Sequence, residues 1–250
     1  MDKAVAMLRE AADQGHELAQ CACGDLYQTG QGVAKDDHLN FVYYEKAAQQ
    51  GNAGAQYNTG VKYQGGRGCE QSYEQAFKWC EKAAQQGHVG AQYNTGNYYR
   101  DGEGCKQSYE RAAEWFEKAA RQGDAGAQVN LGNLYCDGQG VPQSYERAVL
   151  LYRQSAAQGN PSAQYNLAVL YEEGAGVTQD YQEARRLYAL ASAQGDAKAT
   201  EALKRVEEII RNDPCLALTK PRAKKPKPNA PCSCGSGKKY KKCCGGANNN

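Results

Sequence analysis

The sequence lacks several features that would point to a membrane protein or an enzyme. No apolar run approaches the roughly 18 residues that a membrane-spanning helix needs. Histidine is rare, with three residues in 250, which leaves few groups for acid–base catalysis. Only Pro142 and Pro161 interrupt the chain before residue 214. No acidic residue follows Asp213. The near absence of proline before residue 214 and the absence of acidic residues after Asp213 separate a long first part, residues 1–213, from a short segment of different composition.

Charge is divided between the same two parts. All 28 acidic residues but only 21 of the 30 Lys and Arg lie in residues 1–213, which gives this part a net charge of −7 and the remainder +9. The opening MDKAVAMLREAADQG is amphipathic and contains acids, unlike a secretory signal. We therefore expect an intracellular, cytoplasmic protein with no membrane partner, whose 11 cysteines are thiols or metal ligands.

A unit of 36 residues repeats five times without an insertion. The units are residues 16–51, 52–87, 88–123, 124–159 and 160–195, with a half unit before them (2–15) and a capping half unit after them (196–213). With two helices in each unit, this predicts twelve helices over residues 1–213. The first half unit is then either a cap or part of a longer array.

Residue spacing within the unit predicts the two helices. In the first half, small, core and aromatic residues follow one another at intervals of four, as in Ala55, Thr59 and Tyr63, which places them on one helical face. Asn, Asp or His opens each first half, and Ser or Asp opens each second half, where a side chain can cap the helix. The second-half cap residues are Asp36, Ser72, Ser108, Ser144 and Asp180.

Glycine predicts how the helices pack. Gly60, Gly96 and Gly132 lie inside first helices, where each costs about 1 kcal/mol relative to Ala and so implies close contact with a neighbour. Units of this kind cannot bury their apolar faces alone, so they stack. The predicted fold is all-α, a right-handed α/α superhelical solenoid with a concave and a convex surface.

The unit resembles the Sel1-like repeat, a relative of the tetratricopeptide repeat. The shared features are AQYNTG or AQYNLG, a following tyrosine, G-x-G-V or G-x-G-C, and the closing KAAQQG. The resemblance implies a non-catalytic scaffold or adaptor that binds other proteins. Asn40, where alanine is expected, and Cys69 and Cys105, where other units have valine, depart from the pattern.

A polar stripe on the first helices, which line the groove in tetratricopeptide-like solenoids, is the candidate site for a peptide or protein client on the concave face. Its residues lie at helical spacings of three and seven: Asn58, Asn94, Asn97, Asn130, Asn133, Asn166, Asp101, Asp137 and Glu173. Amides in a groove can pair with the backbone of an extended peptide, and the acids would favour basic ligands. The alternative is that each asparagine bonds a neighbouring helix or faces water.

Residues 214–230 are predicted to be a linker. Five of the seven prolines lie between Pro214 and Pro231, interleaved with lysine and arginine. Proline at this density prevents a helix and favours an extended tether.

Residues 231–245 carry four cysteines in the pattern C-x-C-x(8)-C-C, namely Cys232, Cys234, Cys243 and Cys244. Four thiolates brought together by a short hairpin suit the tetrahedral geometry of a structural zinc site. Redox-active thiols, adventitious metal and an iron–sulfur cluster are the alternatives. We expect residues 246–250 to be a disordered tail.

The same stretch resembles the SEC-C motif, in which P-C-x-C-G-S-G-K-K-Y-K-x-C precedes a final Cys or His. The resemblance implies one structural zinc ion per chain and a small surface that binds another protein or the ribosome. The cations expected to contact this partner are Lys224, Lys225, Lys227, Lys238, Lys239, Lys241 and Lys242. Nucleic acid is the alternative partner, although Tyr240 alone is available for stacking. A further alternative is that the lysines have no partner and serve only to keep a solvated linker soluble.

No constellation of catalytic residues stands out. His16 and His88 occupy cap positions, Cys21 and Cys23 point to different faces of one helix, and the glycine pairs recur in every unit instead of forming a phosphate-binding loop. We predict a non-enzymatic adaptor without a small-molecule substrate: a solenoid that holds a client and a basic zinc tail that docks on a second partner. The second hypothesis makes the tail a ribosome or nucleic-acid anchor. An enzyme would require a pocket outside the repeat pattern.

Overall fold

The computed structural model describes residues 3–213, and this part of the chain contains twelve α-helices and no strand. The described residues are divided into two compact units, the first ending at Gln143 and the second beginning at Ser144. The first unit contains α1 (Lys3–Asp13), α2 (Glu17–Thr29), α3 (Asp37–Gln49), α4 (Ala53–Gly65), α5 (Tyr73–Gln85), α6 (Val89–Asp101), α7 (Tyr109–Arg121) and α8 (Ala125–Asp137). The second contains α9 (Tyr145–Ala157), α10 (Pro161–Glu173), α11 (Tyr181–Ala193) and α12 (Ala197–Asn212).

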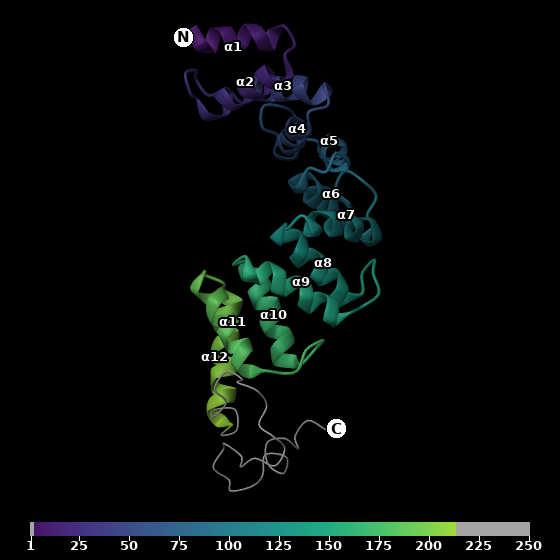
Figure 1. The fold of residues 1–250 in the computed structure, drawn as a ribbon, viewed down its shortest axis with the longest axis vertical. Coiled ribbons are helices and arrows are strands. Elements are labelled where there is room, and N and C mark those ends of the chain that lie inside the picture. The colour runs from purple at the N-terminus through teal and green to yellow at the C-terminus, as the bar shows by residue number, and fades with distance from the viewer. Residues whose placement is uncertain (1–2, 214–250) are drawn as a thin grey trace. The chain divides into compact units, whose positions relative to one another are not determined.

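Within each unit every helix packs on the next one along the chain (Figure 1). Even-numbered helices are the first helices of the repeats and odd-numbered helices are the second helices. The predicted all-α solenoid is confirmed in its helix number and its consecutive packing. None of the helices in residues 3–213 has the length and apolarity needed to cross a membrane.

Polar caps start the helices where the sequence places them. Each second helix from α3 to α11 begins after a serine or aspartate whose side chain accepts a backbone N–H, as Ser72 does from Gln75 at 3.3 Å. Asn52, Asp124, Asn160 and Asp196 cap first helices in the same way. His16 has the extended backbone of an N-cap, but its side chain makes no cap hydrogen bond. His16 therefore does not replace the capping Asn or Asp of the other repeats.

The glycines inside the first helices are contact points with the second helices. A Cβ on Gly96 would lie 2.6 Å from the Phe116 ring, and one on Gly60 would lie 2.6 Å from Cys80 Sγ. Real Cβ atoms do not approach other atoms so closely. At these two positions the repulsion that an alanine side chain would cause outweighs the helix propensity that alanine would gain over glycine. The predicted close packing is confirmed at these two crossings.

The turn between the two helices joins neighbouring repeats. Gly104 has φ +70°, and a Cβ there would overlap the backbone of Tyr73 and Glu74, which starts the second helix of the preceding repeat. Gly68 has φ +79° and meets Asp37 in the same way. Only glycine combines this left-handed conformation with such a close approach. The turn of one repeat thus rests on the helix start of the repeat before it.

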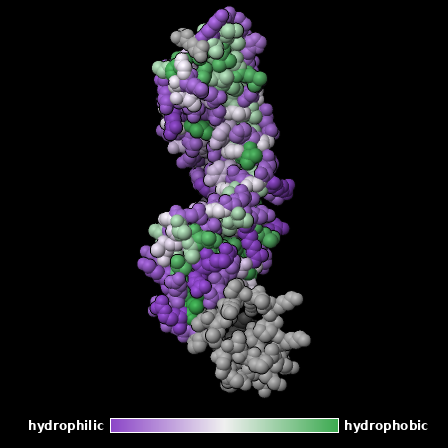
Figure 2. All heavy atoms as spheres, turned by 60° about the vertical axis from the view of Figure 1, so that its left-hand side comes forward, coloured by the Kyte–Doolittle hydropathy of each residue, from purple (hydrophilic) through white to green (hydrophobic). Residues whose placement is uncertain are grey.

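Alanines fill most of the narrow space between helices, and polar side chains cover the outside. Ala47, Ala83, Ala119 and Ala191 are fully buried at one position of the second helix. The face drawn in Figure 2 is mainly hydrophilic, with isolated apolar patches.

Substituting Gly96 by alanine tests the crossing. We expect Gly96→Ala to destabilise the protein by about 1–3 kcal/mol, because the new methyl group overlaps the Phe116 ring. Gly65→Ala is the matched control, since a Cβ there would make only ordinary contacts at 3.6 Å with Arg67, and it should gain up to about 1 kcal/mol. Urea unfolding followed by circular dichroism measures both. Equal changes in the two variants would show that Gly96 is not a contact point.

Candidate interaction surface on the first helices

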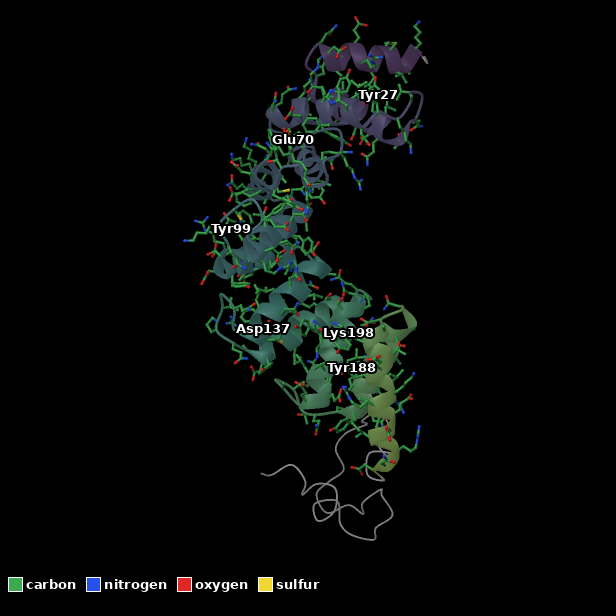
Figure 3. The ribbon with its side chains drawn as sticks, turned by 180° about the vertical axis from the view of Figure 1, so that it is seen from behind. Tyr27, Glu70, Tyr99, Asp137, Tyr188 and Lys198 are labelled. Carbon is green, nitrogen blue, oxygen red and sulfur yellow. The ribbon has the colours of Figure 1, made fainter. Side chains whose placement is uncertain are left out.

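The predicted stripe lies on the first helices at repeated positions. Asn58, Asn94, Asn130 and Asn166 occupy one position on α4, α6, α8 and α10, and Asn97 and Asn133 follow three residues later. The six asparagines are partly buried. The acids Asp101, Asp137 and Glu173 close their helices and are exposed, as Figure 3 shows for Asp137. Spacings of three and seven residues place each set on one side of its helix.

Asparagines of the stripe interact with other side chains inside the protein. Asn130 Nδ2 donates to Asn97 Oδ1 at 3.0 Å and so connects α8 with α6. The Asn94 amide lies near the Tyr57 hydroxyl and the Cys80 thiol and favours a lower pKa of each, although burial outweighs this effect and raises both. Neighbouring repeats are therefore joined by side chains of the stripe. Its role in binding a partner stays a prediction.

The acids of the stripe differ in their surroundings. Arg100 donates from Nε and Nη2 to the two carboxylate oxygens of Asp101, both at 2.7 Å. This two-point pair compensates the charge of Asp101 and fixes its orientation. Asp137 and Glu173 are exposed at the equivalent positions of α8 and α10, so attraction for a basic ligand is expected mainly there.

Tyrosines next to the stripe pack on the start of the following first helix. The Tyr57 ring stacks on the His88 ring with centroids 4.6 Å apart. A Cβ on Gly90 would lie 3.3 Å from Tyr57, and a Cβ on Gly126 would lie 3.0 Å from Tyr93. Each of these tyrosines therefore fills the space that a glycine leaves open on the next repeat.

Six stretches of the chain match the model of the Sel1 repeat: residues 1–16, 18–52, 53–88, 89–124, 125–160 and 161–196. The chain belongs to the Sel1 repeat family. The SEC-C motif model matches residues 229–246. Among curated proteins, none matches this chain.

Two solved structures share the fold over most of the chain. A protective antigen of uropathogenic Escherichia coli strains, described as having an SLR fold, is 36% identical with a TM-score of 0.77 over 84% of this chain. A Sel1 repeat protein from Oxalobacter formigenes is 32% identical with a TM-score of 0.74 over 82% of this chain. The match spans 46% of the E. coli antigen and 90% of the O. formigenes protein.

Buried glutamines form an amide relay between the Sel1 repeats, which the sequence interpretation missed. The glutamine after the buried alanine of each first helix is only 4–5% exposed. Gln56 Nε2 donates to the Ala48 carbonyl at 3.1 Å, and Gln56 Oε1 accepts from Gln86 Nε2 at 2.7 Å. Gln86 Nε2 also donates to the Gly51 carbonyl at 2.9 Å. The relay therefore joins the carboxyl-terminal ends of α3 and α5 through α4.

The same relay recurs along the first unit. Gln50, Gln20 and Ala12 form one copy, and Gln122, Gln92 and Ala84 form another. In the second unit, Gln194 Nε2 donates to Gln164 Oε1 at 2.9 Å. The sequence signal was present, because a glutamine occupies this position in all five units. Its partners lie eight and thirty residues away, beyond the reach of a local pattern.

Tyrosines at the end of the first helices bond acids on the preceding second helix. Tyr63 donates to Glu45 Oε1 and Tyr99 to Glu81 Oε1, both at 2.9 Å. Tyr99, which is labelled in Figure 3, also accepts from Arg111 at 2.9 Å. Burial and the hydrogen bond to Glu45 raise the pKa of Tyr63 to about 12. These hydroxyls therefore remain protonated donors at neutral pH and act as structural contacts.

The cysteines of the described residues do not form a metal site. No group of three or more His, Cys, Asp or Glu side chains in residues 3–213 is arranged to hold an ion. Cys80 is fully buried beneath Gly60, and burial raises the pKa of its thiol to about 12, which makes it a poor nucleophile. The predicted ligands Cys232, Cys234, Cys243 and Cys244 and the tail lysines lie outside the described residues.

His88 caps α6 through its ring. The backbone N–H of Ala91 donates to His88 Nδ1 at 3.2 Å, which requires that nitrogen to be unprotonated. Burial lowers the pKa of His88 below its ordinary value of 6.5. Because the folded state favours the neutral ring, the cap stabilises the protein fully above pH 6.5, and its contribution is lost as the pH falls below that value.

Replacing His88 by asparagine should remove this pH dependence. Asn is a good cap at every pH, as Asn52 and Asn160 show in other repeats, so we expect His88→Asn to flatten the decline in unfolding free energy between about pH 7.5 and about pH 5. His16→Asn is the control, because the His16 side chain makes no cap bond, and it should keep the wild-type decline. Urea unfolding at a series of pH values measures both. An unchanged decline in His88→Asn would contradict the role of the ring.

Proposed function

We propose that this chain is a non-catalytic scaffold that binds a peptide or protein client on its first helices and a second partner through a zinc-stabilised tail. Sel1 repeat proteins generally serve as scaffolds for protein interactions, and this chain belongs to that family. Among the described residues, no group of three or more His, Cys, Asp or Glu side chains is arranged to hold a metal ion, and burial raises the pKa of the Cys80 thiol, which makes it a poor nucleophile. Recognition of other chains is the function that the repeat supports best.

The observation that carries this proposal is the stripe of asparagines and acids. In the first unit its members recur at one place on α4, α6 and α8, so they present amide and carboxylate groups at intervals of one repeat. Amides can hydrogen-bond the backbone of an extended peptide without reading its sequence, and the exposed Asp137 of the first unit would select basic side chains. The proposed client is therefore an extended segment with positive charge.

A peptide-display selection against the whole protein tests the client proposal. We expect enriched peptides to carry net positive charge and to bind Asp137→Ala about threefold to tenfold more weakly, because a charge pair at the edge of the contact is lost. Glu114→Ala is the matched control, since Glu114 is an exposed acid on the second helix α7, and binding should be unchanged. Peptides without charge preference, or equal losses in both variants, would contradict the stripe as the binding site.

The donor set of the tail fits zinc. Cys232, Cys234, Cys243 and Cys244 provide four sulfur ligands, and the SEC-C motif that matches residues 229–246 is a zinc-binding family. Bound zinc would give this short segment its folding energy, because a segment of this size has almost no apolar core. The lysines around it would then form a compact basic surface for the second partner.

Metal content tests the zinc proposal. Elemental analysis of the purified protein should give one zinc ion per chain, and Cys243→Ser should lower this value, because the fourth ligand of a tetrahedral thiolate site is lost. Cys21→Ser, which changes a partly buried cysteine on α2, should retain the full amount. Wild-type protein without zinc, or iron in its place, would contradict the proposal.

A ribosomal or nucleic-acid anchor is the second candidate for the tail. The observation that favours it is the charge of +9 after Asp213, with no acid in that segment. Such binding would depend on phosphate contacts and would not select sequence.

Binding of a single-stranded RNA oligonucleotide separates the two candidates. If the tail is a polyanion anchor, the affinity should fall by about tenfold or more between about 50 and 200 mM salt. It should also fall when Lys224, Lys225 and Lys227 are changed together to glutamine. The control changes three cations of α12, Lys198, Lys204 and Arg211, to glutamine. No RNA binding at the lower salt concentration would leave a protein as the partner of the tail.

A further inference from the structure

Lys62 of α4 is the one charged side chain that the structure buries within residues 3–213, at 7% exposure. Its position belongs to the interior of the repeat. Leucine takes the same place in three other repeats, as Leu26, Leu134 and Leu170, and Tyr98 takes it in the fourth. Leu134, Leu170 and Tyr98 are 2–4% exposed. A lysine therefore stands where the other repeats carry an uncharged side chain.

The Lys62 ammonium group has no direct partner in the part of the chain that the structure describes. None of the ion pairs and side-chain hydrogen bonds of residues 3–213 includes its Nζ. Asp37 on α3 attracts the ammonium group without forming an ion pair, and Arg67, in the turn after α4, repels it. Burying a charge without a compensating partner is costly. The charged form of Lys62 therefore destabilises the fold.

The surroundings of Lys62 favour its neutral form. Burial lowers the pKa of Lys62 below its ordinary value of 10.5, while Asp37 raises it by less and Arg67 lowers it further. A Cys69 thiolate would attract the ammonium group, but burial and Glu45 raise the pKa of this thiol. At neutral pH Lys62 therefore carries more neutral amine than a surface lysine does. The neutral amine is the nucleophilic form.

The Nζ of Lys62 is open to solvent although its stem is buried. Within residues 3–213, the polar side-chain atoms that are sealed from solvent without a partner belong to Asn40, Thr59, Thr95 and Tyr98. Lys62 also lacks a partner but is not in this group, so its Nζ keeps a small opening to solvent. A small reagent can therefore reach the amine, whereas the buried stem prevents close approach of a large one.

Arg67 adds a second cation close to this amine. Its backbone N–H donates to the Lys62 carbonyl at 3.1 Å, and its side chain is exposed. Its charge also acts on the Lys62 amine. Guanidinium groups bind phosphate oxygens through paired hydrogen bonds. A small electrophile that carries a phosphate group is therefore attracted to the place where the neutral amine is available.

We propose that Lys62 is a modification site that takes a small acyl group from an acyl phosphate. The Nζ lone pair attacks the acyl carbon and a C–N bond forms. The bond from this carbon to the phosphate oxygen breaks, and phosphate leaves with the electron pair. The proton that the nitrogen releases goes to the departing phosphate. The step needs no oxidant and no further reactant.

The product of this step fits the site better than lysine does. The amide is neutral, and the other repeats fill the same place with Leu26, Leu134, Leu170 or Tyr98. Because the folded state favours the neutral amine, the ammonium form costs stability at neutral pH, and acylation removes this cost. Acylation of Lys62 therefore stabilises the second repeat.

Acetylation of the full chain by acetyl phosphate tests the site. The rate at each lysine is followed by mass spectrometry of peptides. Lys62 should react about three times as fast as Lys198 or faster, because more of its amine is neutral. Lys198 is the control because it is exposed on α12 and is labelled in Figure 3. The Lys62 rate should also level off at a lower pH than the Lys198 rate. A Lys62 that reacts more slowly than Lys198 would overturn the proposal.

Unfolding in urea tests the gain in stability. The acetyl phosphate treatment should raise the urea midpoint of the wild-type protein. Lys62→Arg keeps the charge and cannot be acylated in this way, so the same treatment should leave its midpoint unchanged, which excludes an effect of other lysines. Lys62→Met, with a neutral unbranched side chain, should show a raised midpoint without treatment. An equal rise in treated Lys62→Arg, or a lower midpoint in Lys62→Met, would contradict the role of the buried charge.

A comparison of two acyl donors tests the part played by Arg67. Arg67→Gln should slow the reaction of Lys62 with acetyl phosphate about threefold more than its reaction with acetic anhydride, which carries no phosphate. Arg185→Gln is the control, because Arg185 is exposed on α11, and it should leave both rates unchanged. Equal slowing with the two donors would overturn the assignment of an acyl phosphate.

Discussion

A buried amide relay is the interaction on which the stacking of the repeats depends. Each copy of the relay in the first unit is centred on one glutamine of a first helix. Its amide nitrogen donates to a carbonyl in the last turn of the preceding second helix. Its amide oxygen accepts from the glutamine at the end of the following second helix. Gln56, at 5% exposure, has both ends of its amide satisfied by protein groups. A buried amide that lost one partner would leave the other unsatisfied, at a cost of about 1–3 kcal/mol. The relay therefore fixes the spacing of consecutive repeats.

This constraint divides the repeat into fixed and variable positions. The relay glutamines, the crossing glycines Gly60 and Gly96 and the turn glycines Gly68 and Gly104 are tied to backbone groups of other helices. The stripe residues differ between repeats: Asp101 pairs with Arg100, Asn130 pairs with Asn97, and Asp137 is exposed. A scaffold can therefore change what it recognises on the variable positions without changing how its repeats stack.

Local patterns predicted much of the fold. The period of 36, the caps and the glycine crossings follow from rules that act within one helix or one turn, and five copies reinforced each of them. The surroundings of single side chains were not predictable in this way. His16 and His88 look alike in sequence, yet only the side chain of His88 caps its helix, and only the His88 ring is stacked on a tyrosine of the preceding repeat, Tyr57. Asn40 has its Oδ1 buried without a partner in the described residues, where other repeats have alanine. The tail motifs lie beyond residue 213, so the zinc ligands stay a prediction.

A double-mutant cycle on Gln56 and Gln86 tests the relay most directly. Unfolding free energies of Gln56→Ala, Gln86→Ala and the double variant give the coupling energy between the two side chains. The relay predicts a coupling of about 1 kcal/mol or more, because removal of either glutamine already breaks the contact between the ends of α3 and α5. Additive losses within about 0.3–0.5 kcal/mol would show that the two amides act independently and would contradict the account.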